Sequence, residues 1–147
     1  MTAILTEVLG RRVVASDTAE EIGEVKAVVA DRTGRRFTAI HVAGRRRSAE
    51  LVDWNDITAI GCDAVMVTSA GAVTGVPDQR AEDAVKGAID YLGATVLSTD
   101  GVVLGTVSDV HFDEAGGTVV GLLTNDGRIE GDRIRGLGTF AAVVDAA

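Results

Sequence analysis

Short runs of apolar residues, many alternating with polar ones and separated by polar or glycine-containing turns, predict strands rather than long helices. In the first half of the chain we expect strands at residues 12–16, 23–30, 37–42, 48–52 and 65–68. Asp31-Arg32-Thr33-Gly34 lies between two of them and ends in a glycine, as hairpin turns do where φ must be positive. We therefore expect an antiparallel hairpin at this position.

The same pattern returns in the second half of the chain. Leu9-Gly10-Arg11-Arg12-Val13 returns as Leu92-Gly93-Ala94-Thr95-Val96, 83 positions later. The hairpin residues Asp31 and Gly34 return as Asp113 and Gly116. Corresponding strands are expected at residues 96–99, 105–112, 118–124, 128–130 and 140–144. An internal repeat of this kind indicates two copies of one small β unit.

The segments that precede the two copies differ. Residues 2–9 resemble a short helical lead-in, whereas Pro77-Asp78 begins a helix that we expect to reach about Ala88, because Pro and Asp are favoured at helix N-termini. The predicted domains are copy one at 1–70, a linker with the short helix at 71–88, and copy two at 89–147. The predicted fold class is all-β and mainly antiparallel, with two small barrels packed as a pseudo-twofold pair.

Composition and charge narrow the function. The 147 residues are 46% hydrophobic, which is enough to form a packed core. The net charge of −8 argues against general binding to nucleic acids, DNA included, because affinity for phosphate comes from Lys and Arg. No apolar run is long enough to span a membrane. The start of the chain lacks the basic flank and long apolar run of a signal peptide, so we expect a cytoplasmic location.

No residue pattern in the sequence points to an enzyme. His41 and His111 lie at non-equivalent places in the two copies, and neither has the ligand spacing of a zinc site. Cys62 lies beside Asp63, whereas a nucleophilic thiol needs a nearby base and positive surroundings. We therefore expect no catalytic residue, no metal and no cofactor.

The repeated Leu-Gly-x-x-Val pattern, the glycine step into a Val-rich strand, the Asp-to-Gly hairpin and the element Asp53-Trp54-Asn55-Asp56-Ile57 together resemble the PRC-barrel domain. Both copies carry the resemblance, although Asp53 replaces the family's usual proline and copy two has Gly131 where copy one has the tryptophan. Because copy two lacks the tryptophan, we expect its turn to be looser than that of copy one. The resemblance implies a small, mainly antiparallel barrel that docks onto other macromolecules and has no catalytic residue.

Two features of copy one are candidates for contacting a partner. The arginines of the two expected hairpin ends could bind carboxylates or phosphates together, although a solvated surface that protects strand edges is the interpretation we favour. These arginines are Arg35, Arg36, Arg45, Arg46 and Arg47. Trp54 could anchor a partner or pin the closing turn of its barrel, and the structural role is favoured.

The predicted function is a non-enzymatic protein-interaction or adaptor module, serving ribosome or RNA maturation or the assembly of a larger complex. A protein partner is expected. The alternative is direct binding of RNA or another anion through the arginines of copy one. The sequence also leaves open whether the protein forms a homodimer.

Overall fold

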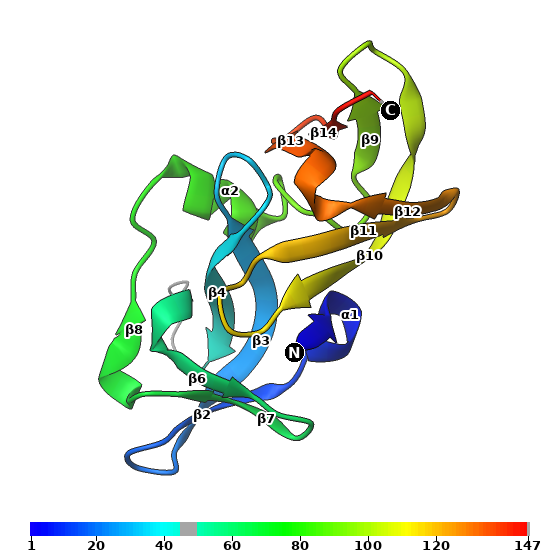
Figure 1. Ribbon diagram of the computed structural model, residues 1–147. Helices are drawn as coiled ribbons and strands as arrows, with labels where there is room; N and C mark the ends of the chain where they lie inside the picture. Colours follow the sequence, from blue (N-terminus) through cyan, green and yellow to red (C-terminus); the bar gives the residue numbers. More distant parts are fainter. Residues whose placement is uncertain (45–49, 147) are drawn as a thin grey trace.

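The computed structural model describes residues 1–44 and 50–146. Within them the chain forms two strongly bent β-sheets of seven strands each, and only two short α-helices accompany them (Figure 1). The predicted all-β class is confirmed.

Copy one contributes one of the two sheets. Its strands are β2 (Arg12–Ala15), β3 (Glu21–Ala30), β4 (Phe37–Gly44), β5 (Glu50–Asp53), β6 (Ile57–Ile60), β7 (Ala64–Val67) and β8 (Val73–Thr74). They pair in the order β6-β7-β2-β3-β4-β5-β8, and every pair is antiparallel except β2 with β7. The 3-10 turn η1 (Trp54–Asp56) connects β5 to β6, and η2 (Ala70–Ala72) leads into β8.

Copy two repeats this topology. Its strands are β9 (Thr95–Ser98), β10 (Val103–Asp113), β11 (Val119–Thr124), β12 (Gly127–Glu130), β13 (Ile134–Leu137) and β14 (Ala142–Val144). Their order, β12-β11-β10-β9-β14-β13, matches β5-β4-β3-β2-β7-β6, and the parallel pair β9 with β14 matches β2 with β7. The 3-10 turn η3 (Gly131–Arg133) corresponds to η1. The internal repeat is therefore a repeat of strand order as well as of sequence.

The turn η3 has the same length as η1 but lacks the side-chain cap that Asp53 gives to η1, and at Gly131 it lies close to β11. A Cβ atom at Gly131 would collide with the backbone carbonyl of Val119. Copy two therefore replaces the tryptophan side chain by a direct approach of two backbone segments, which only glycine allows.

The leading segment of each copy packs on the other copy. Ahead of copy one, β1 (Thr2–Ile4) pairs antiparallel with β10, and α1 (Leu5–Val8) contacts the same strand. Ahead of copy two, α2 (Gln79–Lys86) packs on β3. The expected helical lead-in is thus partly a strand, and it belongs to the sheet of copy two, whereas β8 of the expected linker joins the sheet of copy one.

The helix α2 lies where Pro77-Asp78 predicted one. Asp78 accepts a hydrogen bond from the backbone N–H of Ala81 at 2.8 Å, which caps the first turn. Gly87 ends the helix with φ +81°, a conformation that favours glycine.

One hydrophobic core runs through both copies. It includes Val13 and Val25 of copy one together with Val96 and Val107 of copy two, all of them buried. Val13 is equivalent to Val96 and Val25 to Val107, so the same buried positions of both sheets contribute to this one cluster. The protein is a pair of barrels that share a core.

Candidate functional site

The two Asp-to-Gly hairpins meet at the contact between the copies. The backbone N–H of Phe37 donates to the carbonyl of Gly117 at 2.8 Å, and that of Val119 donates to the carbonyl of Arg35 at 2.7 Å. These bonds are equivalent, because Phe37 corresponds to Val119 and Arg35 to Gly117 in the repeat. The hairpins therefore join the barrels around a pseudo-twofold axis.

Four aromatic rings from both copies surround this contact. The ring of Phe37 lies 5.5 Å from Trp54, 5.5 Å from Tyr91 and 4.9 Å from Phe112, measured between centroids. All four side chains are buried. The indole N–H of Trp54 donates to the carbonyl of Glu114 in copy two at 3.1 Å. The structure thus places Trp54, a predicted partner-binding residue, between the barrels with its N–H already paired.

Two of the predicted arginines also reach across to copy two. Arg35 donates from Nε to the carbonyl of Ile134 at 2.6 Å and from Nη2 to the carbonyl of Asp132 at 2.8 Å. Arg36 donates from Nε to the carbonyl of Gly116 at 3.0 Å. Their hydrogen-bonding groups therefore contribute to holding the barrels together. The remaining predicted residues, Arg45, Arg46 and Arg47, lie outside the described residues.

Tyr91 completes the contact from the segment that follows α2. Its hydroxyl donates to the carbonyl of Gly34 at 2.5 Å, and the side chain is 2% exposed. Burial raises the pKa of Tyr91 far above its ordinary value of 10.0. The phenol therefore stays protonated and acts as a fixed hydrogen-bond donor.

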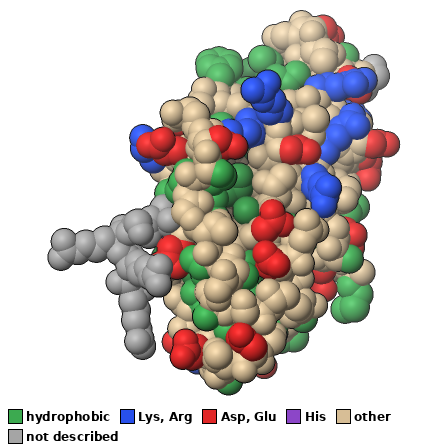
Figure 2. Space-filling model, turned by 90° about the vertical axis from the view of Figure 1, so that its left-hand side faces the viewer, with side chains coloured by type: hydrophobic (Ala, Val, Ile, Leu, Met, Phe, Trp, Pro, Cys, Tyr) green, Lys and Arg blue, Asp and Glu red, His purple; other side chains and the backbone are tan. Residues whose placement is uncertain are grey.

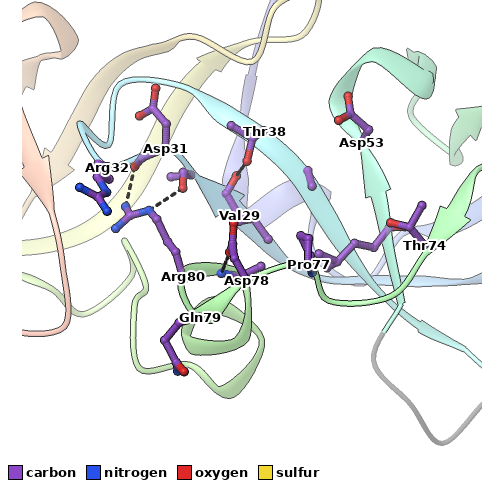
Figure 3. A pocket seen from close by; sticks show the side chains of 14 residues that line it. Val29, Asp31, Arg32, Thr38, Asp53, Thr74, Pro77, Asp78, Gln79 and Arg80 are labelled. Carbon is purple, nitrogen blue, oxygen red and sulfur yellow. Dashed lines mark hydrogen bonds between the residues drawn. The ribbon is translucent and has the colours of Figure 1, made fainter.

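An open groove lies between α2 and the outer face of the first sheet (Figure 3). Its volume is about 610 Å³. The floor consists of Val29, Ala39 and Leu51, from three neighbouring strands. Pro77 and the first turn of α2 form one wall, and Thr74 of β8 lies on the other side. Val29 and Leu51 are buried in a cluster with Ala81 and Ala84 of α2, and Ala39 is the half-buried apolar residue of the floor.

Arg80 fixes the position of α2 beside this groove. Its guanidinium donates to the carbonyls of Ala30 at 2.9 Å, Asp31 at 2.5 Å and Leu137 at 2.8 Å. Ala30 ends β3 of copy one and Asp31 follows it (Figure 3), whereas Leu137 ends β13 of copy two. One side chain therefore ties α2 to both barrels, and the wall of the groove is held rigidly.

Acidic side chains border the groove. Asp31, Asp53 and Asp78 line it, and each carboxylate accepts one local hydrogen bond, from Thr33, Asn55 and Ala81 respectively. Arg32 is the one basic lining residue whose side chain has no hydrogen-bond partner among the described residues. Figure 2 shows apolar side chains exposed between charged ones on this side of the molecule. The groove combines an apolar floor with a border of net negative charge.

The two histidines and the cysteine lie in different parts of the fold, His41 on β4, His111 on β10 and Cys62 between β6 and β7. Burial, followed by the charge of Lys26, lowers the pKa of His41, so this ring is neutral at pH 7. Nδ1 of His111 lies 2.7 Å from a guanidinium nitrogen of Arg128, and Cys62 is exposed. Within residues 1–44 and 50–146, no three His, Cys, Asp or Glu side chains lie close enough to hold a metal ion.

The comparison with known protein families agrees with this architecture. The model of the PRC-barrel domain matches residues 2–73 and 85–139, and the chain therefore belongs to the PRC-barrel domain family. The two matched segments correspond to the two copies. No curated protein matches the chain. In the part of the chain that the structure describes, no helix is long and apolar enough to cross a membrane.

The groove and its supports were not predicted from the sequence. Arg80 and Tyr91 lie in or just after a predicted helix, where Arg is a common surface residue and Tyr a common core residue. Their acceptors are backbone carbonyls 49 to 57 positions away. Only the acidic border has a sequence signal, because Asp53 and Asp78 each begin a predicted turn or helix.

Proposed function

We propose that the protein is a non-enzymatic protein-binding module in which the α2 groove holds a short extended segment of a partner protein. The observation that carries this proposal is the groove itself, an open cavity of about 610 Å³ with an apolar floor and a polar border. Cavities of this size and lining suit a few side chains of a ligand. PRC-barrel domains are generally non-catalytic modules that mediate protein interactions, which supports the same reading.

The lining specifies the chemistry of the partner segment. An apolar side chain would cover Ala39, the half-buried residue of the apolar floor. A lysine or arginine next to it would reach Asp53 or Asp31 at the border, where the carboxylates outnumber the free basic group Arg32. The expected segment is therefore an extended, basic one with one or two apolar anchors.

The fused barrels make the binding surface preformed. Arg80 holds α2 against both copies, so the groove does not need to be assembled when the partner arrives. A preformed surface lowers the entropic cost of association. We place this activity in the cytoplasm, in ribosome or RNA maturation or in the assembly of a larger complex.

Direct RNA binding is the competing function. The sequence suggested it through the arginines of copy one, Arg35, Arg36, Arg45, Arg46 and Arg47. Arg35 and Arg36 donate hydrogen bonds to copy two, which leaves fewer groups for phosphates. Replacing Arg45, Arg46 and Arg47 by Glu tests what remains of this function. Loss of a salt-sensitive RNA retention in that variant would favour RNA binding.

Site-specific crosslinking tests the proposed function. A photoreactive amino acid at Gln79, an exposed groove residue, is activated in native extract with and without nuclease, and crosslinked peptides are sequenced. The proposal predicts nuclease-resistant crosslinks to a discrete basic segment of a protein. It also predicts their loss in Ala39→Glu, which fills the groove, and their retention in Ala59→Glu, which places the same side chain on exposed β6. Crosslinks that persist in Ala39→Glu, or that disappear with nuclease, would contradict it.

A further inference from the structure

The two copies differ at one sheet edge. In copy one, β5 pairs on its outer side with β8, through Leu51 with Thr74 and Val52 with Val73. In copy two, the equivalent strand β12 ends the sheet, and no other described strand pairs with its outer side. The same position in the fold is therefore occupied in one copy and open in the other.

The hairpin geometry identifies which backbone N–H and C=O groups of β12 are not hydrogen-bonded to β11. The two-residue loop Asn125-Asp126 makes Thr124 and Gly127 a hydrogen-bonded pair, and Ile129 is then hydrogen-bonded to Leu122. Successive residues of a strand direct their N–H and C=O groups to opposite sides. The N–H and C=O groups of Arg128 and Glu130 consequently face away from β11, at the free edge.

We propose that this free edge of β12 binds an extended segment of a second protein as an added antiparallel strand. This surface is separate from the α2 groove, and the proposal does not depend on the groove being occupied. The β5–β8 pair provides the pattern. Val52 corresponds to Ile129, so a valine or isoleucine is expected opposite Ile129, as Val73 lies opposite Val52 and packs on the shared core.

Charge favours a basic segment over a second copy of this chain. Asp126, Glu130 and Asp132 are exposed around β12. Arg128 already pairs with Glu130 at 2.9 Å, and the guanidinium of Arg35 donates to the carbonyls of Asp132 and Ile134. A second copy would bring another net charge of −8 to this edge. A strand with basic ends would instead complement it. Main-chain hydrogen bonds supply the affinity in this mode of recognition, and alternate side chains supply the specificity.

Amide exchange measured by NMR tests the proposal with a defined probe. The probe is a capped peptide of the sequence Lys-Thr-Val-Thr-Val-Thr-Val-Lys. In the free protein we expect fast exchange at the amides of Arg128 and Glu130 and slow exchange at Ile129. At about 90% saturation the first two should slow by about tenfold, because exchange then proceeds through the roughly one tenth of molecules that are free. No slowing at Arg128 and Glu130 would overturn the proposal.

Two controls separate strand addition from other binding. The same peptide N-methylated at its threonines lacks the N–H groups that would face β12 and should not slow exchange; an equal effect would overturn the proposal. Arg128→Pro removes an outward N–H, which an edge strand tolerates, and should abolish peptide binding, whereas Arg128→Ala keeps the N–H and should retain it.

The remaining outcomes also decide the question. Shifts confined to residues of the α2 groove would overturn the edge site while leaving the proposed function intact. Slowing at Arg128 and Glu130 that grows with protein concentration in the absence of peptide would identify a second copy as the occupant, and this result too would overturn the proposal.

Discussion

Arg36 and Thr118 occupy equivalent positions in the two copies and face each other as an antiparallel bridge at the contact between the barrels. The bonds from Phe37 to Gly117 and from Val119 to Arg35 flank this bridge symmetrically. Each hairpin therefore pairs with the equivalent hairpin of the other copy. The backbone of each hairpin helps to join the two barrels, whereas Arg32 and Thr33 at the turn of the first hairpin stay exposed.

Trp54→Ala should lower the free energy of unfolding by about 3 to 5 kcal/mol, because it empties a buried site and leaves the carbonyl of Glu114 without its donor. Urea denaturation measures the change. Phe140→Ala is the matched control, since this aromatic side chain is 85% exposed, and it should change stability by less than about 0.5 kcal/mol. Equal effects of the two variants would contradict the placement of Trp54 between the barrels.

Val107→Asp should unfold or aggregate the protein, because it puts a carboxylate into the shared core at a side chain that is 2% exposed. Val103→Asp introduces the same group on the same strand at a position that is 63% exposed, and it should stay soluble and folded. Circular dichroism and size-exclusion chromatography distinguish the two. A soluble, fully folded Val107→Asp would show that this residue is not in the core.

Arg80→Lys should destabilise the protein by about 2 kcal/mol, because one ammonium group cannot serve three carbonyls that the planar guanidinium reaches together. Arg32→Lys makes the same change at an exposed side chain of the same groove and should be close to neutral. Thermal unfolding of both variants measures the difference. If Arg80→Lys is as stable as Arg32→Lys, Arg80 does not hold α2 in place.

Tyr91 should remain un-ionised in the folded protein above pH 10. Its folded pKa is raised above the unfolded value of 10.0, so its contribution to stability is present below that pH and is lost as pH rises further. Tyr91 is the single tyrosine of the chain, so the ultraviolet absorbance of phenolate reports on it alone. Phenolate should form only as the protein unfolds. A reversible titration near pH 10 in the folded state would contradict the burial of this hydroxyl.

Tyr91→Phe keeps the ring and removes the hydroxyl. It should cost about 1 kcal/mol through the lost bond to Gly34, and the decline in stability above pH 10 should become shallower. Chemical denaturation at several pH values measures both effects. An unchanged pH profile would assign the alkaline loss of stability to other groups.

Local patterns predicted much of the fold. The Asp31-to-Gly34 hairpin, its repeat and the helix after Asp78 depend on turn and capping residues within a few positions, and all three are present. The strands β6 and β13 were missed, because four residues without clear alternation carry little periodic signal. The transfer of β1 to copy two was missed as well, since the partner of a three-residue strand is decided by tertiary packing.

The candidate site was less predictable for a related reason. A sequence shows that Arg35 and Arg36 are basic, but whether a guanidinium meets solvent or a distant carbonyl depends on how the copies pack. Their acceptors lie 80 to 99 positions further along the chain. The groove likewise exists because α2 covers only part of one sheet face, a feature of packing that no motif encodes.

The two barrels form one body, joined by the hairpins, the aromatic cluster and the exchanged leading segments. Differential scanning calorimetry of the whole chain tests it most directly. We expect one transition in which the calorimetric and van't Hoff enthalpies are equal, and Trp54→Ala should lower the midpoint of that single transition. Two resolved transitions, with only one shifted by Trp54→Ala, would show that the barrels unfold independently and do not form one body.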